Sequence, residues 1–292
     1  MSSKKSPVKL LSKEKFPKGL FEIPEPPLKL YIRGEFPNEE KIFLAIVGSR
    51  RCTSYGRDVC KKLVEGLKGY PIVIVSGLAL GTDSNAHEAA IDAGLTTIAV
   101  PGSGINPDIL YPRSNIKLAE KILENGGCLI SEFEPDAKSE IYMFPKRNRI
   151  MAGMSKAVLI IEAQEKSGTL ITARLATDYN REVLAVPGSI FSPTSLGTNK
   201  LLRLGATPIA TSSDILEALG FERDEKKPTQ EELFKDCSPN ERKVLEILTE
   251  PLARDELLRA MDMPISEASG ILSLMEIKEL IKEEYGEIQR IY

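Results

Sequence analysis

Short apolar segments of strand character alternate with helical segments through the middle of the chain. Segments such as 42–48 and 71–77 are rich in Val and Ile and lack the polar–apolar alternation of a half-exposed strand. Strands that are apolar on both faces belong in a parallel sheet covered by helices on both sides. The pattern therefore predicts an α/β fold, an extended, mostly parallel, doubly wound sheet of Rossmann type. Its strands are expected at 42–48, 71–77, 96–102, 127–131, 157–162, 182–186 and 206–210.

The sequence outside this region predicts three further stretches. Residues 1–40 hold five Pro between Pro17 and Pro37 and predict a partly irregular lead-in. After the main domain at 41–220, residues 221–237 are charged and contain a Pro, which indicates a linker. Residues 238–292 contain three helical patterns and two short strands, as in a winged-helix module. In its third helix the predicted buried face consists of residues 271, 274, 277 and 280.

Composition argues against membrane, metal and secreted classes of protein. The longest apolar runs fall far below the roughly 18 residues that span a bilayer, and the first residues lack the apolar core of a signal peptide. Four cysteines show no CxxC spacing and no neighbouring histidine: Cys52, Cys60, Cys128 and Cys237. We therefore expect a cytoplasmic protein with reduced thiols, no membrane contact and no metal or cofactor.

The distribution of charge limits how nucleic acid could bind. Residues 41–220 carry 20 basic and 18 acidic groups, and residues 238–292 carry 7 and 12. Neither segment is the strongly basic domain that general duplex binding would require, so any nucleic-acid site must be a local patch. The acidic terminal module should be repelled by phosphates. We therefore expect this module to be a protein-contact or regulatory element. The alternative is that it is an inert appendage.

The stretch from residue 142 to 172 contains the strongest candidate for such a patch. Three cations occur within four residues beside an aromatic ring and a planar amide, a combination that suits phosphates and unstacked bases. We expect a loop here, followed by a turn of small residues at 152–155. The alternative is a surface loop with scattered basic residues. The candidate residues are Phe144, Lys146, Arg147, Asn148 and Arg149.

Two strand ends supply further candidates. Backbone N–H groups and helix dipoles at the carboxyl ends of parallel strands favour anions. No segment completes GxGxxG or GxxxxGK[ST], so a standard dinucleotide or Walker site is not expected. Glycine could also serve only to form each turn. The candidates are Gly48, Ser49 and Arg50 after the first strand, and Lys166, Ser167 and Gly168 after the strand at 157–162.

The ionisable residues give no support for catalysis. His87 is the only histidine and is expected to be a hydrogen-bonded packing residue. Glu132 and Glu162 follow strands and could form a carboxylate pair. No nucleophile with a base accompanies them, so hydrolysis is not supported and the protein is not expected to be an enzyme.

Eight separated segments resemble the DNA-processing protein DprA (Smf) family over about residues 42–219. They occur in the family's order: VGSRRCTSYG, SGLALGTDSNAHEAA, YPRSN, LISEFEP, FPKRNRIMAGMS, EAQEKSGTLITA, VLAVPGS and GTNKLLRLGA. The resemblance implies that 41–220 is a DNA-binding domain with a positively charged groove. It also implies a dimer that protects incoming single-stranded DNA and loads the RecA recombinase during natural transformation. The terminal module resembles the winged-helix domain of many members, whereas the family's N-terminal helical domain has no counterpart in residues 1–40.

The resemblance assigns roles to several candidates by position. Arg50 becomes a phosphate contact, residues 144 and 147–149 belong to the DNA-binding loop, and Lys166 and Gly168 lie at the next strand end. Ile141 stands where some members have a lysine. Two alternatives remain. Nucleotide phosphoribohydrolases share this type of sheet but use a PGGxGT loop where this chain has EKSGTL. A nucleotide-sensing protein could use the same strand ends.

Overall fold

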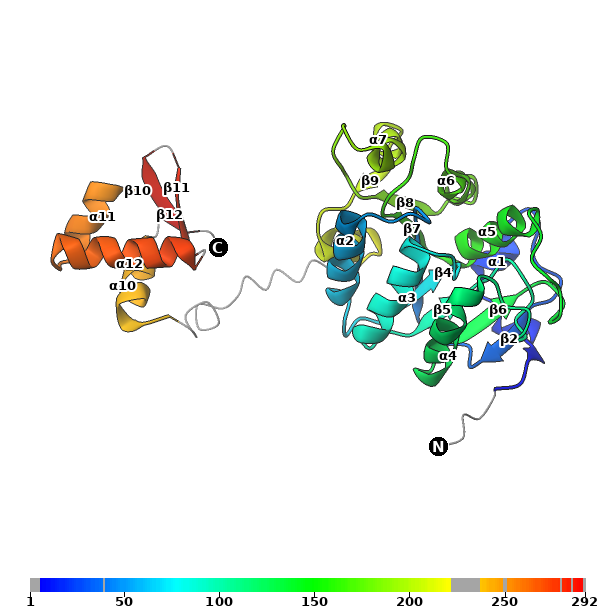
Figure 1. Cartoon of the computed structure of the whole chain (residues 1–292). Helices are drawn as coiled ribbons and strands as arrows, with labels where there is room; N and C mark the ends of the chain where they lie inside the picture. Colours follow the sequence, from blue (N-terminus) through cyan, green and yellow to red (C-terminus); the bar gives the residue numbers. More distant parts are fainter. Residues whose placement is uncertain are drawn as a thin grey trace. The chain divides into compact units, whose positions relative to one another are not determined.

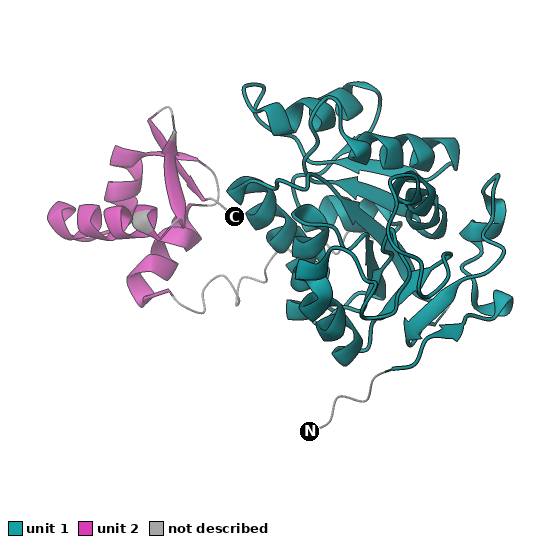
Figure 2. Ribbon diagram, turned by 45° about the vertical axis from the view of Figure 1, so that its right-hand side comes forward, with its two compact units in different colours: residues 1–223 teal, residues 224–292 magenta. Residues whose placement is uncertain are grey.

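The computed structural model divides into two compact units, Met1–Arg223 and Asp224–Tyr292 (Figure 2). It describes residues 6–38, 40–221, 237–248, 251–278, 280–284 and 286–290. Residues 222–236, most of the expected linker, lie outside the described residues. No helix of the described part is long and apolar enough to cross a membrane.

A nine-stranded sheet forms the centre of the first unit (Figure 1). Its seven expected strands are all present and pair in parallel, which confirms the predicted mostly parallel sheet. They are β3 (Ile42–Val47), β4 (Ile72–Ser76), β5 (Thr97–Ala99), β6 (Cys128–Ser131), β7 (Ala157–Ile160), β8 (Glu182–Ala185) and β9 (Thr207–Pro208).

The strand order reverses in the middle of this sheet. The order is β1-β2-β6-β5-β4-β3-β7-β8-β9, so the chain builds outward from β3 to β6 and then returns to start β7 on the other side of β3. Val47 and Ile160 are paired near the carboxyl ends of β3 and β7. In open α/β sheets such a reversal leaves a crevice between the two outgoing loops, where ligands bind.

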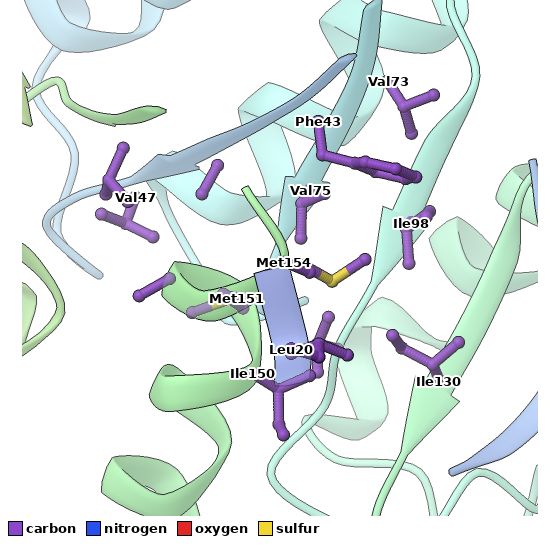
Figure 3. Close-up of a cluster of buried hydrophobic side chains, with 14 of the residues drawn as sticks. Leu20, Phe43, Val47, Val73, Val75, Ile98, Ile130, Ile150, Met151 and Met154 are labelled. Carbon is purple, nitrogen blue, oxygen red and sulfur yellow. The ribbon is translucent and has the colours of Figure 1, made fainter. Parts of the chain in front are cut away.

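Helices cover both faces of the sheet, as the doubly apolar strands require. On one face α1 (Gly19–Glu22), α5 (Met143–Met154) and α6 (Gly168–Asp178) pack on Phe43, Ala45 and Val47 (Figure 3). On the other face lie α2 (Ser54–Glu65), α3 (Thr82–Asp92) and α8 (Ser212–Ala218). The remaining helices are α4 (Ile116–Glu124) and α7 (Leu196–Arg203), with one-turn 3-10 segments at Lys13–Lys15, Arg113–Asn115 and Pro193–Ser195.

The N-terminal stretch, expected to be a partly irregular lead-in, is integrated into the core. Strands β1 (Lys9–Leu10) and β2 (Tyr31–Gly34) extend the sheet antiparallel to β6. Leu20 and Leu30 are fully buried in the cluster beneath α5. Very short strands among prolines leave little periodicity in the sequence, which explains why it did not reveal this integration.

The expected loop at 142–155 is wrong, because residues Met143–Met154 form helix α5. Pro145 lies in the first turn, where a missing N–H costs no intrahelical hydrogen bond. Ile150, Met151 and Met154 pack into the core beside the sheet. Because two of the basic side chains are also buried, the helix lacks the polar outer face that would identify it in the sequence.

The second unit has the three predicted helices and the predicted hairpin. They are α10 (Pro239–Ile247), α11 (Arg254–Ala260), α12 (Ile265–Ile277), β11 (Ile281–Glu284) and β12 (Glu287–Arg290), with a short extra strand β10 (Leu252–Ala253) beside β12. The predicted buried face of α12 is correct only in part. Ile271 and Leu280 pack partly buried against the core of this unit, and the side chain at 277 lies outside the described residues. Ala268, Leu272 and Met275 are buried, whereas Leu274 is 48% exposed.

The integration of the N-terminal stretch gives a direct test. Leu20→Ala should lower the free energy of unfolding by about 2–5 kcal/mol, because it removes a buried side chain and leaves a cavity. Leu28→Ala is the matched control, since Leu28 is 83% exposed and its loss should change stability little. Urea denaturation measures both. Equal effects of the two substitutions would show that this stretch does not contribute to the core.

Candidate functional site

A cavity of about 520 Å³ opens between the carboxyl ends of β3 and β7. Its walls are the loop after β3, the loop between β7 and α6, and one side of α5. It therefore occupies the crevice where the strand order reverses. Nine of the eleven predicted site residues line it: Gly48, Ser49, Arg50, Phe144, Arg147, Asn148, Lys166, Ser167 and Gly168.

Lys146 and Arg149 are the two predicted residues that do not line this cavity. Positions 144, 147, 148 and 151 follow the i, i+3, i+4, i+7 spacing of one helix face, and all four contribute to the wall. The helical conformation of α5 therefore turns Lys146 and Arg149 away. Met151 is a lining residue that the same spacing would have identified, had the stretch been recognised as a helix.

Arg149 is buried and forms an ion pair on the far side of α5. Its Nη2 binds the carboxylate of Glu132, and its Nη1 donates to the Glu25 carbonyl oxygen at 2.6 Å. Burial raises the pKa of Glu132, and the neighbouring Arg149 opposes this shift. The pair connects α5, the end of β6 and the N-terminal stretch.

Arg147 is a buried cation that forms part of the cavity wall. Its Nη1 donates to the Val100 carbonyl oxygen at 2.6 Å. Burial lowers the pKa of Arg147 to about 10, so the side chain remains protonated at neutral pH. Asp83 lies close enough to oppose that shift. A Cβ at Gly77 would lie 1.6 Å from the guanidinium, so the turn after β4 requires glycine for Arg147 to fit.

Arg50 lies at the rim of the cavity on the ring of Phe144. Its guanidinium carbon is 5.2 Å from the ring centroid, a cation–π geometry. The Phe144 ring meets the Tyr111 ring edge to face, with the two ring centroids 6.1 Å apart. A Cβ at Gly102 would lie only 2.6 Å from the Phe144 ring. Phe144 is thus held on several sides and supports the exposed cation. Tyr111 and Gly102 belong to the loop after β5, and local sequence patterns did not reveal the contact of Tyr111 with Phe144.

The N-terminus of α6 forms the wall opposite Arg50. Ser167 caps the helix by accepting from the backbone N–H of Thr169. The Thr169 hydroxyl donates to the Gly48 carbonyl oxygen at 3.0 Å, which joins this helix to the loop after β3. Helix N-termini attract anions through their free N–H groups and dipole. Lys166, which is exposed, adds a positive charge beside this end.

The expected carboxylate pair does not form. Three strands separate β6 from β7, which places Glu132 and Glu162 on the order of 19 Å apart at a strand spacing of about 4.8 Å. Glu162 is buried and accepts from the backbone N–H of Thr53 at 2.9 Å, from its hydroxyl at 2.6 Å and from the Thr194 hydroxyl at 2.9 Å. It therefore joins the loops after β3 and β8.

His87 is a packing residue, as predicted. Its Nδ1 lies 2.7 Å from the hydroxyl oxygen of Thr97, whose proton is donated to the Ile74 carbonyl oxygen. Nδ1 must therefore carry the histidine's proton and donate it. Complete burial lowers the pKa of His87 to about 3, so the ring is neutral at physiological pH. Within the described residues no group of three His, Cys, Asp or Glu side chains could hold a metal ion.

The Arg149–Glu132 ion pair predicts a pH-dependent loss of stability. Arg149→Met should cost roughly 3–5 kcal/mol at neutral pH, because it leaves a buried carboxylate unpaired. The pKa of Glu132, already raised by burial, should rise further. A carboxyl whose pKa is higher in the folded than in the unfolded state binds its proton more tightly when folded, so lowering the pH favours the folded state. The stability lost through Arg149→Met should therefore shrink as the pH falls.

Urea denaturation at several pH values measures this effect. Arg174→Met is the matched control, because the Arg174 side chain is 84% exposed on α6. A loss of stability that does not change with pH would show that Glu132 is not left charged and buried.

Two family models match the chain. Residues 8–220 match the model of the DNA recombination-mediator protein A family, and residues 224–287 match that of the DprA winged helix domain. Protein Smf of Escherichia coli is 41% identical over 208 residues, which are 71% of this chain and 55% of Smf. The DNA processing protein DprA of Bacillus subtilis is 40% identical over 210 residues, which are 72% of this chain and 70% of that protein.

Two solved structures share the fold. DNA processing protein A of Streptococcus pneumoniae superposes with a TM-score of 0.67 at 36% identity, over 75% of this chain and 76% of that one. The DNA processing protein A of Helicobacter pylori, whose structure was described for its single-stranded DNA binding mode, superposes with a TM-score of 0.66 at 33% identity. The match covers 75% of this chain and 98% of that one. The chain spans only about half the length of the E. coli Smf. The protein belongs to the DNA recombination-mediator protein A family, the DprA/Smf family that its motifs resemble.

Proposed function

We propose that the cavity between β3 and β7 binds single-stranded DNA. The observation that carries this proposal is the convergence of Arg50, Lys166 and the α6 N-terminus on one cavity at the reversal of strand order. Guanidinium, ammonium and helix N-terminal N–H groups all bind phosphate oxygens. The family relationship supports the same ligand, because the H. pylori relative binds single-stranded DNA.

The size and lining of the cavity favour an unpaired strand over a duplex. A space of about 520 Å³ suits a nucleotide or two but cannot admit a double helix. Apolar Met151 and Ile171 line it together with the amide of Asn148, so an unstacked base would find both packing and hydrogen-bonding partners. Residues 1–220 carry 28 basic and 24 acidic groups, too balanced for strong general attraction to duplex.

We also propose that the protein is a binder and not an enzyme. Glu132 and Glu162 do not line the cavity, and their carboxylates bind Arg149 and two threonines. The buried His87 does not line it either. The phosphoribohydrolase alternative would require a free carboxylate at the nucleotide. Asp83 lines the cavity, but it is buried beside Arg147 and accepts from the Ala79 N–H at 3.3 Å. Incubation with nucleoside monophosphates tests it, because an enzyme of that class would release free base.

The finer role proposed for the protein is to protect incoming DNA and to load RecA onto it as a homodimer. Support comes from membership of a family of recombination mediators. A dimer would present two cavities to one strand, and two linked sites raise affinity by effective concentration. Light scattering should therefore give twice the chain mass of 32.2 kDa.

For the winged-helix unit we propose a protein-contact or regulatory role. Winged helices that read duplex DNA place a helix with free cations in the major groove. Here at least five of the seven cations bind carbonyl or carboxylate oxygens of the same unit: Arg242, Lys243, Arg254, Lys278 and Arg290. With 12 acidic residues alongside them, little positive charge is free to meet phosphate.

The cavity proposal predicts a change in the salt dependence of binding. Each phosphate contact that is lost should flatten the slope of log K against log salt by about 0.7 on a single strand. Arg50→Ala with Lys166→Ala should therefore weaken binding of an oligothymidine and flatten the slope by about 1.4. Fluorescence anisotropy at several salt concentrations measures both quantities. Arg174→Ala, outside the cavity, is the control. Unchanged affinity and slope in the double variant would rule out this location.

The role of the second unit predicts the effect of its removal. A chain that ends at Lys227 should bind single-stranded DNA within a few-fold of the full chain, because the cavity lies wholly in the first unit. RecA filament assembly on the DNA should decline if the unit contacts protein. Tight binding of duplex DNA by the isolated 228–292 fragment at moderate salt would contradict the charge argument.

A further inference from the structure

The turn between β8 and α7 exposes two large apolar side chains. Phe191 is 91% exposed and Ile190 is 74% exposed, and no other large apolar side chain of the described part is more exposed than Phe191. An aromatic ring left in water forgoes the stabilisation that burial of its large apolar surface would give. Together with Ile190, such a ring on an ordered turn offers an apolar surface to a ligand.

The turn that presents Phe191 is held by hydrogen bonds. The Ser192 N–H donates to the Ser189 carbonyl oxygen at 3.0 Å, and the Phe191 N–H donates to the Ser189 hydroxyl oxygen at 3.2 Å. At its base, Asn199 of α7 accepts from the Gly188 N–H at 3.3 Å and donates to its carbonyl oxygen at 2.9 Å. The ring is therefore presented on a preorganised backbone, which reduces the entropy lost when a ligand binds.

This turn is attached to the loop that lines the cavity. Strand β8 pairs with β7, so their outgoing loops leave the same edge of the sheet (Figure 1). The Ala163 N–H donates to the Thr194 carbonyl oxygen, and the Gly197 N–H donates to the Ala163 carbonyl oxygen, both at 2.8 Å. Ala163 directly precedes Gln164, a lining residue of the cavity. The turn that carries Phe191 is thus attached beside one end of the proposed DNA site.

The charge of this region suits a polyanion. Residues 183–213 contain no Asp or Glu, although the chain has 42 of them in 292 residues. The same segment contains Lys200 and Arg203, both exposed. No carboxylate of this segment would repel a phosphate backbone that passed over it, and two cations would attract it.

We propose that Phe191 is a stacking platform for a nucleobase of the DNA strand that leaves the cavity. The proposal rests on the proposed function and extends it from one cavity to a longer track along the sheet edge. Every base has a flat face, so such a platform binds without sequence preference. The ring of Phe144, which already contacts Arg50 and Tyr111, is less available for this role.

The test compares two oligothymidines, one of about four nucleotides and one of about sixteen, the range of site sizes seen in single-strand binders. Phe191→Ala should weaken binding of the long strand by about 5- to 160-fold, the range of one base–aromatic stack. Binding of the short strand, which can occupy the cavity and its rim without extending onto the β8–α7 turn, should change less than about two-fold. Phe191→Tyr keeps a stacking face and should bind the long strand like the parent protein, whereas Phe191→Leu should not.

Two controls separate the possible failures. Arg50→Ala should weaken binding of both oligonucleotides. If it weakens binding of neither, the DNA site is not at this cavity, regardless of the result for Phe191→Ala. If Arg50→Ala weakens binding of both oligonucleotides while Phe191→Ala weakens binding of neither, Phe191 is not a stacking platform and the cavity remains the binding site. If Phe191→Ala instead lowers the mass seen by light scattering without DNA, and Phe191→Leu restores it, the ring is a protein contact and the proposal is overturned.

Discussion

The parallel pairing of β3 with β7 is the constraint on which the rest of the structure depends. These strands are apolar on both faces, so they must lie in the middle of a covered sheet. Because the chain builds the sheet outward from β3 and later returns beside it, the loops after both strands leave from neighbouring positions. The hydrogen bond from Thr169 to Gly48 joins these loops across the junction. The cavity is the space that this arrangement leaves open.

The basic stretch in helix α5 contributes side chains both to the cavity wall and to the buried core. One face presents Phe144 and Asn148 to the cavity, while Arg149 is directed into an ion pair with Glu132. Arg147 combines the two roles, since it is buried yet contributes to the wall. The exposed Arg50 is then supported by Phe144. A rigid second layer of this kind holds a binding group in place before the ligand arrives.

The sequence predicted the sheet well because continuous Val and Ile runs have few alternative folds. It also identified most cavity residues, since glycine, serine and cations at strand ends follow directly from the parallel topology. It failed on α5, where Pro145 and the basic residues resemble a loop and burial removes the amphipathic signal. It could not reveal the contact of Tyr111 with Phe144 or the role proposed for Phe191. Their roles depend on which loops meet at one edge of the sheet, and local patterns carry no such information.

The central claim is that the cavity at the β3–β7 junction binds single-stranded DNA. The most direct measurement titrates one labelled oligonucleotide, alone and annealed to its complement, at about 50 mM and about 200 mM salt. The proposal predicts tighter binding of the single strand at both concentrations, with a smaller loss on adding salt than a protein with many phosphate contacts would show. Equal or tighter binding of the blunt duplex would contradict it.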